Sequence, residues 1–364
     1  MLKRTRSFLV LVMLLMTVTM SAQVTTATMS GKVTAQDEPI IGATIVAIHE
    51  PSGTRYGTVT NVSGQFNLQG MRTGGPYKVE ISYVGYQTAI YKGINLLLGE
   101  NYVLNVSLKE SSELLDEVVV TASKESNMKS DRAGAIMNAN RDMISNTPTI
   151  SRSISDIMRL SPQGADVGNG FAVGGGNYRQ SFVTVDGAAF NNTFGLGGNL
   201  PANGSPISLD ALEQVTVAVT PFDVRQSGFT GGAINAVTRS GDNQFRGTAY
   251  MYFNNENLKG SKVDDYELLR SKAQYYTYGA SFGGPIIKDK LFFFVNGEYE
   301  DNVTAGSNYR PRTALGESYS GGNIHRPLQS DMDDMRGFLL NKYNFDPGKY
   351  NDYSTDTPAY RVMA

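Results

Sequence analysis

The chain of 364 residues contains no cysteine, no tryptophan and only two histidines. Without cysteine it can form no disulfide and no thiolate metal site, and it cannot carry a lipid on an N-terminal cysteine. Its formal net charge of −2 provides no basic field of the kind that nucleic acid attracts. The composition therefore argues against a disulfide scaffold and a nucleic-acid partner, and it permits the periplasm.

Motifs for catalysis or metal binding are also missing from the sequence. His49 and His325 are far apart, no HExxH-like string occurs, and we expect both to be surface residues. The acidic group Asp331, Asp333 and Asp334 lacks the glycine and glutamate of a calcium loop, which favours a solvated acidic loop. No nucleophile-elbow sequence supports Ser/His/Asp catalysis. We predict no enzyme, no cofactor and no metal.

The N-terminus has the features of a secretory signal peptide. Basic residues at positions 3, 4 and 6 precede an apolar run from Phe8 to Met20, and small residues follow it as far as Ala22. A signal peptide combines a basic start with an apolar core of about 7–15 residues and a small-residue cleavage site. A spanning helix would need roughly 20 apolar residues. We therefore predict export, with cleavage at Ala22.

Residues 24–110 are predicted to form a small β-sandwich. The whole chain has 39 glycines, 20 tyrosines and 16 phenylalanines, and glycine with aromatics in short alternating runs is typical of β-structure. From Tyr102 to Leu108 apolar residues occupy every second position, which is the period of a half-buried strand. A turn at Gly64 precedes a strand that begins with Phe66, which we expect to be buried.

Residues 123–243 mix helix and strand signals. Ser153 can cap a short helix with Asp156 three positions later, and Pro162 would end that helix. Strands are predicted over 182–185 and 215–219, with loops rich in glycine and asparagine between them. The pattern indicates a second domain of α/β type.

From residue 244 onward the pattern is that of a membrane β-barrel. Apolar side chains alternate with more polar ones over 245–253 and 291–300, as strands require when one face meets lipid and the other a lumen. A short turn is predicted within 283–290, and the stretch from Asp301 to about Thr357 is predicted to be a long polar loop. We count three strands and the start of a fourth at Tyr360. A soluble β-domain would alternate similarly.

A short extended segment separates the first two regions. It lies within 113–122 and consists of Leu115, Asp116, Glu117, Val118, Val119, Val120, Thr121 and Ala122. Its β-branched valines favour extended backbone, and a strand without its own sheet can add to the open sheet edge of another protein. The alternative is an ordinary edge strand of the preceding sandwich.

Short sequence phrases lie at residues 60–66 and 82–86 in the first region, and at 155–162, 183–187, 212–217, 221–226 and 231–241 in the second. These phrases resemble those of TonB-dependent outer-membrane receptors. The first region resembles the carboxypeptidase-regulatory-like domain often fused to them, and the extended segment resembles their TonB box. The second region resembles their plug domain, most closely in the Oar-like branch.

This resemblance implies a mostly β protein that begins with a small sandwich, continues with an α/β plug and ends in the first strands of an outer-membrane barrel. The implied boundaries are 1–22 for the signal peptide, 24–110 for the sandwich, 113–122 for the TonB-box-like segment, 123–243 for the plug and 244–364 for the barrel strands. A plugged barrel has a closed wall of about 22 strands, which residues 244–364 cannot supply. We therefore expect the chain to be the N-terminal part of a larger receptor.

The implied function is transport across the outer membrane with energy relayed by TonB. The C-terminal domain of TonB, coupled to a proton-driven inner-membrane motor, would pair with Leu115–Ala122 in the periplasm, and lipid would surround the complete barrel. Substrate would be contacted by plug loops, with Asn191, Asn192, Phe194 and Asn199 as candidates, and by the loop 301–357. The substrate is unidentified, and import and export both stay open. The alternative function is a periplasmic or surface β-sandwich binding module without transport.

Overall fold

The computed structural model describes most of the chain after the predicted signal peptide. The described residues are 25–110, 118–121, 136–149, 152–167, 170–191, 200, 205–219, 230–260, 262–264, 266–267, 272–306, 309–319, 324–351 and 353–364. Two compact units can be separated: residues up to Gly247 with Phe282–Val295 and Met363–Ala364, and Thr248–Ser281 with Asn296–Val362. No helix within the described residues is long and apolar enough to cross a membrane.

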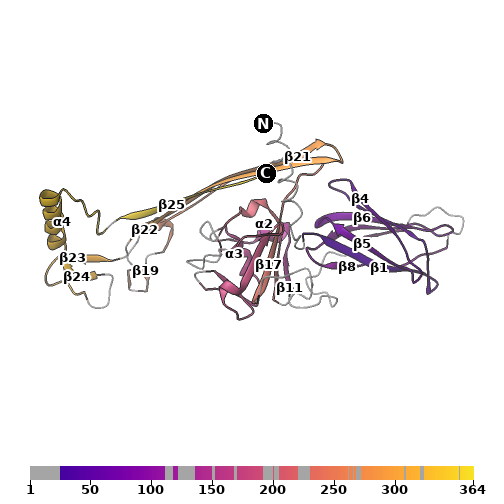
Figure 1. Ribbon diagram of the computed structural model, residues 1–364, viewed down its shortest axis with the longest axis horizontal. Coiled ribbons are helices and arrows are strands. Elements are labelled where there is room, and N and C mark those ends of the chain that lie inside the picture. The colour runs from indigo at the N-terminus through magenta and orange to yellow at the C-terminus, as the bar shows by residue number, and fades with distance from the viewer. Residues whose placement is uncertain are drawn as a thin grey trace, which may run out of the picture. The chain divides into compact units, whose positions relative to one another are not determined.

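The first described region is a β-sandwich (Figure 1). In one sheet β1 is flanked by β2 and β5, which run antiparallel to it, and by β8 and β9, which run parallel. The other sheet has the order β10-β7-β6-β3-β4. The strands are β1 (Ala27–Ala35), β2 (Glu38–Pro39), β3 (Thr44–His49), β4 (Thr54–Val59), β5 (Gln65–Met71), β6 (Gly74–Ser82), β7 (Ala89–Leu96), β8 (Asn101–Val103), β9 (Val106–Ser107) and β10 (Val118–Thr121).

Alternating side chains from both sheets form the core of the sandwich. Met29, Ile45 and Ile81 are fully buried and belong to one apolar cluster. Phe66 joins this cluster, as predicted, after a turn in which Gly64 has a φ of +72°. A Cβ at Gly64 would lie 2.6 Å from the Val33 carbonyl oxygen, so this turn requires glycine.

The second region is built on a five-stranded sheet with the order β11-β16-β17-β14-β15, and β12 and β13 form a separate hairpin. In the large sheet β14 pairs with β17 in parallel and the other neighbours are antiparallel. The elements are β11 (Ile136–Ala139), α2 (Arg141–Asn146), α3 (Ile154–Met158), β12 (Gly164–Asp166), β13 (Phe171–Val173), η2 (Tyr178–Gln180), β14 (Ser181–Val185), β15 (Ala188–Ala189), η4 (Leu209–Ala211), β16 (Leu212–Ala218) and β17 (Gly232–Thr238).

Helix α3 begins where the sequence predicts. Ser153 is its N-cap and forms a capping box with Asp156, so that side chains satisfy backbone donors at the helix start. Ile154, Ile157 and Met158 are fully buried in the apolar cluster of this region, which also contains the sheet residues Val215 and Val217.

The third region contains a four-stranded sheet with the order β18-β21-β22-β25, so strands that follow one another along the chain are neighbours. A parallel pair, β23 and β24, and a helix lie between β22 and β25 in the sequence. The elements are β18 (Arg246–Asn255), η5 (Glu256–Leu258), β19 (Lys262–Val263), β20 (Tyr266–Glu267), β21 (Ala273–Ile287), β22 (Leu291–Ala305), β23 (Arg310–Arg312), β24 (Ile324–Leu328), α4 (Gln329–Tyr343) and β25 (Ser354–Met363).

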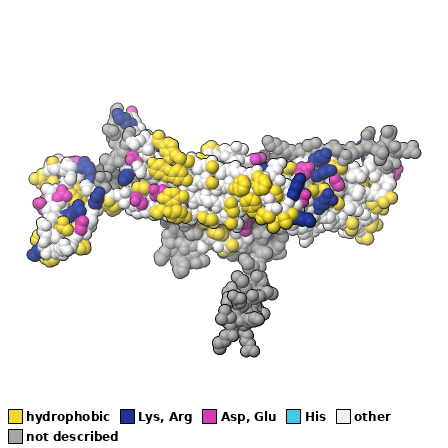
Figure 2. All heavy atoms as spheres, turned by 90° about the horizontal axis from the view of Figure 1, so that it is seen from above, with side chains coloured by type: hydrophobic (Ala, Val, Ile, Leu, Met, Phe, Trp, Pro, Cys, Tyr) yellow, Lys and Arg dark blue, Asp and Glu magenta, His cyan; other side chains and the backbone are white. Residues whose placement is uncertain are grey.

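The faces of this sheet have the polarity that membrane strands require. Along β22 the polar residues Asn296, Glu298 and Glu300 are buried. Val295, which directly precedes Asn296, is 42% exposed. Hydrophobic side chains gather over the sheet in Figure 2. Apolar exposure combined with polar burial is favourable when lipid, rather than water, covers the outer face.

The predicted fold class, mostly β with a sandwich and barrel-like strands, is confirmed. Two expectations are wrong. His49 is buried, with only 4% of its surface exposed, because it follows Ile45 and Ala47 on the inward face of β3. The stretch 301–357 is not only loop, since it contains β23, β24 and the 15-residue helix α4, in which Asp331, Asp333 and Asp334 lie.

Candidate functional site

The extended segment between the first two regions contains strand β10, and β10 is paired with the sandwich. Val118–Thr121 runs parallel to Ala89–Lys92 of β7, with Val118 opposite Ala89 and Thr121 opposite Lys92. Strand β10 is thereby the outermost strand of the second sandwich sheet. This is the arrangement of the edge-strand alternative, and it shows that the segment can add to a sheet edge.

The chain just before this segment is also attached to the start of β7. The Gln87 amide donates to the Lys109 carbonyl oxygen at 2.9 Å, and Tyr86 and Glu110 form an antiparallel bridge. Seven residues then separate Glu110 from Val118. The segment is therefore tethered by a short connection to the strand on which β10 pairs.

The other end of β7 contacts the second region through a buried glutamine. The Gln214 side chain of β16 donates from Nε2 to the Leu96 carbonyl oxygen at 3.1 Å, and its Oε1 accepts from the Leu98 amide at 2.9 Å. Asn138 of β11 donates to the Glu100 carboxylate at 2.5 Å. The same strand thus carries β10 at its start and contacts the second region at its end.

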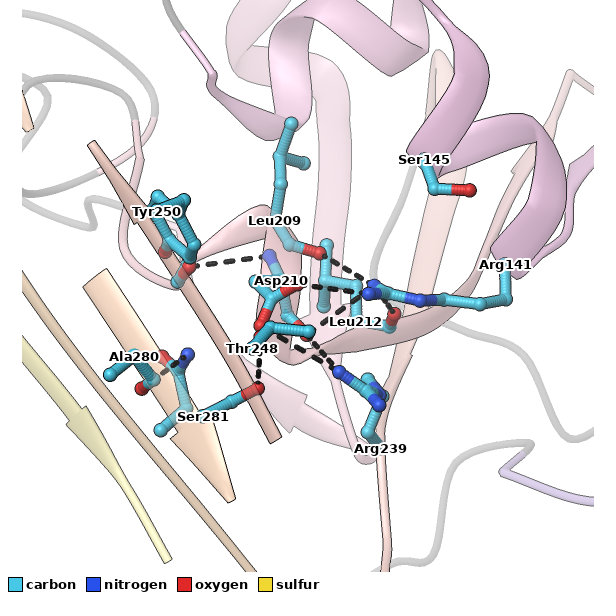
Figure 3. Close-up of polar contacts among 12 residues, drawn as sticks. Arg141, Ser145, Leu209, Asp210, Leu212, Arg239, Thr248, Tyr250, Ala280 and Ser281 are labelled. Atoms are coloured by element: carbon cyan, nitrogen blue, oxygen red, sulfur yellow. Dashed lines mark hydrogen bonds and ion pairs between the residues drawn. The ribbon is translucent and has the colours of Figure 1, made fainter. Parts of the chain in front are cut away.

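Within the second region two arginines share one buried carboxylate, as Figure 3 shows. Asp210 Oδ1 accepts from Arg141 Nη2 at 2.9 Å, and Arg239 Nη1 lies 3.6 Å from Asp210 Oδ2. Arg141 also donates to the carbonyl oxygens of Leu209, Asp210 and Leu212. These bonds tie α2, η4 and the end of β17 together, which makes the cluster a structural anchor of the fold.

A polar cavity of about 140 Å³ lies beside this cluster. His49, Arg72, Glu213, Arg239 and Arg246 are among its lining residues. Burial raises the pKa of the Glu213 carboxyl, and the surrounding arginines oppose that shift. The arginines have partners within the chain, since Arg72 donates to Ser240 and Arg246 pairs with Asp242.

The buried polar face of the four-stranded sheet carries a second charge cluster. Arg361 of β25 pairs with Glu298 at 2.9 Å and with Glu300 at 2.7 Å, both on β22. Tyr250 of β18 donates its hydroxyl hydrogen to Glu298 at 2.5 Å. Three strands are joined by these contacts.

The structure describes only part of the predicted site. Val118, Val119, Val120 and Thr121 form β10. The asparagine at 191 uses its amide on its own domain: Oδ1 accepts from the Val183 amide at 2.7 Å, and Nδ2 donates to the Ser181 carbonyl oxygen at 2.8 Å. The other predicted residues lie outside the described ones: Ala22, Leu115, Asp116, Glu117, Ala122, Asn192, Phe194 and Asn199.

Gln214 and the two charge clusters were not predicted from the sequence. A signal for Gln214 was present, because it is a polar residue inside a strand of otherwise buried apolar residues, β16. Arg361 had a comparable signal, since it alternates with Tyr360 and Val362. Among the described residues no group of three histidines or acidic residues is placed to hold a metal ion.

Two family models match parts of the chain. Residues 28–109 match the carboxypeptidase regulatory-like domain, and residues 237–344 match an outer membrane beta barrel domain. The first match covers the sandwich, and the second covers β18, β21 and β22.

Two characterised relatives are TonB-dependent proteins. The TonB-dependent transporter Oar of Myxococcus xanthus is 29% identical over 181 residues, which are 48% of this chain and 16% of the relative. The TonB-dependent receptor SusC of Bacteroides thetaiotaomicron is 29% identical over 269 residues, 70% of this chain and 24% of the relative. The siderophore receptor PirA of Acinetobacter baumannii overlaps with a TM-score of 0.39 at 20% identity, over 49% of this chain and 27% of that one.

The chain therefore spans less than a quarter of the length of the two curated relatives that it matches. Those relatives are a transporter and a receptor rather than enzymes. The match to an outer-membrane barrel domain agrees with the outward apolar face of the four-stranded sheet. The resemblance and the outer-membrane location predicted from the sequence are confirmed, and over the matched residues the chain is similar to TonB-dependent outer-membrane transporters.

Proposed function

We propose that this chain carries the TonB-coupling segment and the plug of an outer-membrane transporter. The observation that carries the proposal is the position of Val118–Thr121, a short strand added to a sheet edge between the sandwich and the second region. A strand that can add to one sheet edge through its backbone has the property that TonB pairing needs. Under this proposal residues 123–243 are the plug and residues 24–110 a periplasmic appendage.

In the proposed mechanism, TonB pairs with Leu115–Ala122 as an added strand and pulls. The pull reaches the plug through the connection that follows Ala122, and part of the plug is displaced. Backbone hydrogen bonds supply the affinity, and the β-branched valines keep the segment extended. We propose that the chain is not an enzyme and that the proton-driven motor in the inner membrane supplies the energy.

Substrate contact is proposed for the loop that begins at Asn191 and for the stretch 301–357. The amide of Asn191 is engaged with the β14 backbone, which suits a residue that fixes the base of a loop. Contact with substrate would then fall to the loop residues Asn192, Phe194 and Asn199. The chemistry of the substrate and the direction of its transport are separate questions that growth and secretion phenotypes of a deletion strain would answer.

The first test is capture of the chain by a purified TonB C-terminal domain. Val119→Pro removes a backbone donor from the segment, and we expect it to abolish capture, whereas Val119→Thr keeps both the donor and β-branching and should be captured normally. Equal capture of the two variants would contradict the proposed coupling role.

The second test separates the transporter from a soluble binding module. An antibody against residues 24–110 would be used on fractionated cells that produce the native protein. We expect a band well above the 39.5 kDa of this chain in the outer-membrane fraction. A band near the mature size of this chain in the soluble periplasm would favour the binding module instead.

A further inference from the structure

Strand β7 of the sandwich already pairs with Val118–Thr121, which is part of the segment to which TonB is proposed to bind. Strand β7 pairs with β6 along one of its edges and with β10 along the other. We call the outer backbone edge of Ala89–Lys92 the β7 docking edge. From this pairing we propose that the β7 docking edge is a resting site for the coupling strand, which competes with TonB for Val118–Thr121. The inference rests on the proposed function.

The pairing has the strength expected of a reversible contact. It involves four residues on each strand and runs parallel, and parallel ladders are slightly less stable per residue than antiparallel ones. The coupling strand is attached to the same sandwich by seven residues after Glu110. A tether of that length holds the strand at an effective concentration in the millimolar range, so even a weak pairing is populated.

The coupling strand can pair with the β7 docking edge or with TonB, but not with both at once. If the strand occupies the β7 docking edge for about nine-tenths of the time, its apparent affinity for TonB falls about tenfold. Anything that loosens the docking edge then raises the affinity by up to the same factor. The sandwich would in this way keep the receptor from engaging TonB continuously.

Lys92 offers a way to perturb the docking edge at a position outside the registered β6–β7 pairs. It lies opposite Thr121 of β10, but it falls in the irregular part of the β6–β7 ladder, between the registered pairs Val79–Tyr91 and Tyr77–Ile94. Its side chain is exposed. Lys92→Pro removes a backbone donor at this position and leaves the registered β6 partners in place, whereas Lys92→Ala keeps the donor.

The absence of cysteine from the chain permits a direct test of the docked state. Lys92→Cys combined with Thr121→Cys places two cysteines on neighbouring strands, with Cα atoms about 4.8 Å apart, within the Cα–Cα span of a disulfide. The matched control pairs Thr121→Cys with Arg55→Cys on β4, the opposite outer strand of the same sheet, about four strand spacings or 19 Å away. Both pairs are introduced into the full chain.

We expect the 92/121 pair, and not the 55/121 pair, to cross-link on mild oxidation. The oxidised 92/121 chain should lose capture by the TonB C-terminal domain at least tenfold and regain it on reduction. Lys92→Pro should bind TonB up to about tenfold more tightly than wild type, and Lys92→Ala should bind like wild type.

The outcomes separate this inference from the proposed function. If reduced chains are captured but the 92/121 pair cross-links no better than the control, the docked state is not populated and the inference fails. If the cross-linked chain is captured as well as the reduced one, TonB adds to the free edge of β10 and the competition is wrong. If no chain, including Lys92→Pro, is captured, the proposed coupling role itself fails.

Discussion

The sandwich and the four-stranded sheet alternate with the same period but place opposite residues inside. In the sandwich strand β6, Val79 and Ile81 are buried while polar neighbours point outward. In β22, Asn296 and Glu298 are buried while Val295 is exposed. A period of two therefore identifies a strand with two different faces, and the identity of the buried residues indicates which solvent covers the outer face.

The two regions also differ in the groups that hold their inner faces together. The sandwich interior is one apolar cluster, whose cohesion comes from the hydrophobic effect. The four-stranded sheet β18-β21-β22-β25 is called the membrane sheet below. Its buried face is joined by the ion pairs of Arg361 with Glu298 and Glu300. Removing one member of such a network leaves an uncompensated buried charge, whereas trimming an apolar residue leaves a cavity.

The largest effect is expected from breaking the ion network of the membrane sheet. Arg361→Met leaves the carboxylates of Glu298 and Glu300 without their buried cation, which costs about 3–5 kcal/mol. We expect sharply reduced assembly in the outer membrane and loss of the folded band at lower temperature on semi-native gels. Adding Glu298→Gln and Glu300→Gln to the same variant should restore much of the stability, because no charge then remains unpaired. Normal assembly of Arg361→Met alone would show that water solvates this face.

A cavity in the sandwich is the matching test of the apolar interior. Ile81 is fully buried, and Ile81→Ala should lower the free energy of unfolding of the sandwich by about 2–5 kcal/mol. Val59 of β4 is 60% exposed, and Val59→Ala should change stability by less than about 0.5 kcal/mol. Pulse proteolysis of the whole chain in urea, with the antibody against residues 24–110, measures both. Equal sensitivity of the two variants would mean that this alternation does not define a core.

A lysine placed on the exposed face of each sheet tests whether lipid or water covers that face. Val295 in the membrane sheet and Val59 in the sandwich are 42% and 60% exposed. Val295→Lys should destabilise by about 2–4 kcal/mol if the residue lies near the bilayer midplane and by less near an interface. Val59→Lys should be nearly neutral. Heat-modifiability of the outer-membrane form and urea unfolding of the sandwich give the two numbers, and a neutral Val295→Lys would place this face in water.

Alternation predicted several strands because it depends only on neighbours along the chain. The buried Phe66, the capped helix at Ser153 and the strand at Tyr360 were accessible in this way. Helix α4 was missed although Met332, Met335 and Leu339 recur at helical spacing. Its first half is rich in aspartate, and none of its residues is buried. Its first residue also follows Leu328, which provides no capping side chain.

The pairing of β10 with β7 could not be predicted from the segment alone. The valines of Leu115–Ala122 indicate an extended strand, but which sheet edge it joins depends on where the fold leaves an edge open. Strand β7 has such an edge because β8 and β9 join the other sheet. Likewise, Gln214 finds its partners at Leu96 and Leu98 only after both regions have folded.

His49 gives the last test, with the smallest effect per pH unit, because it is a polar residue that the sandwich buries in its neutral form. Burial, and secondarily Arg72, lower the pKa of His49 from 6.5 to about 4. Between these two values the unfolded chain binds a proton that the folded chain does not, so stability rises with pH from about 4 to 6.5. The slope contributed by His49 is at most about 1.4 kcal/mol per pH unit. His49→Gln should flatten this part of the stability profile, measured by urea unfolding at several pH values, whereas His325→Gln at an exposed position should leave it unchanged. An unaltered profile for His49→Gln would mean that the sandwich, like the membrane sheet, accommodates a buried charge.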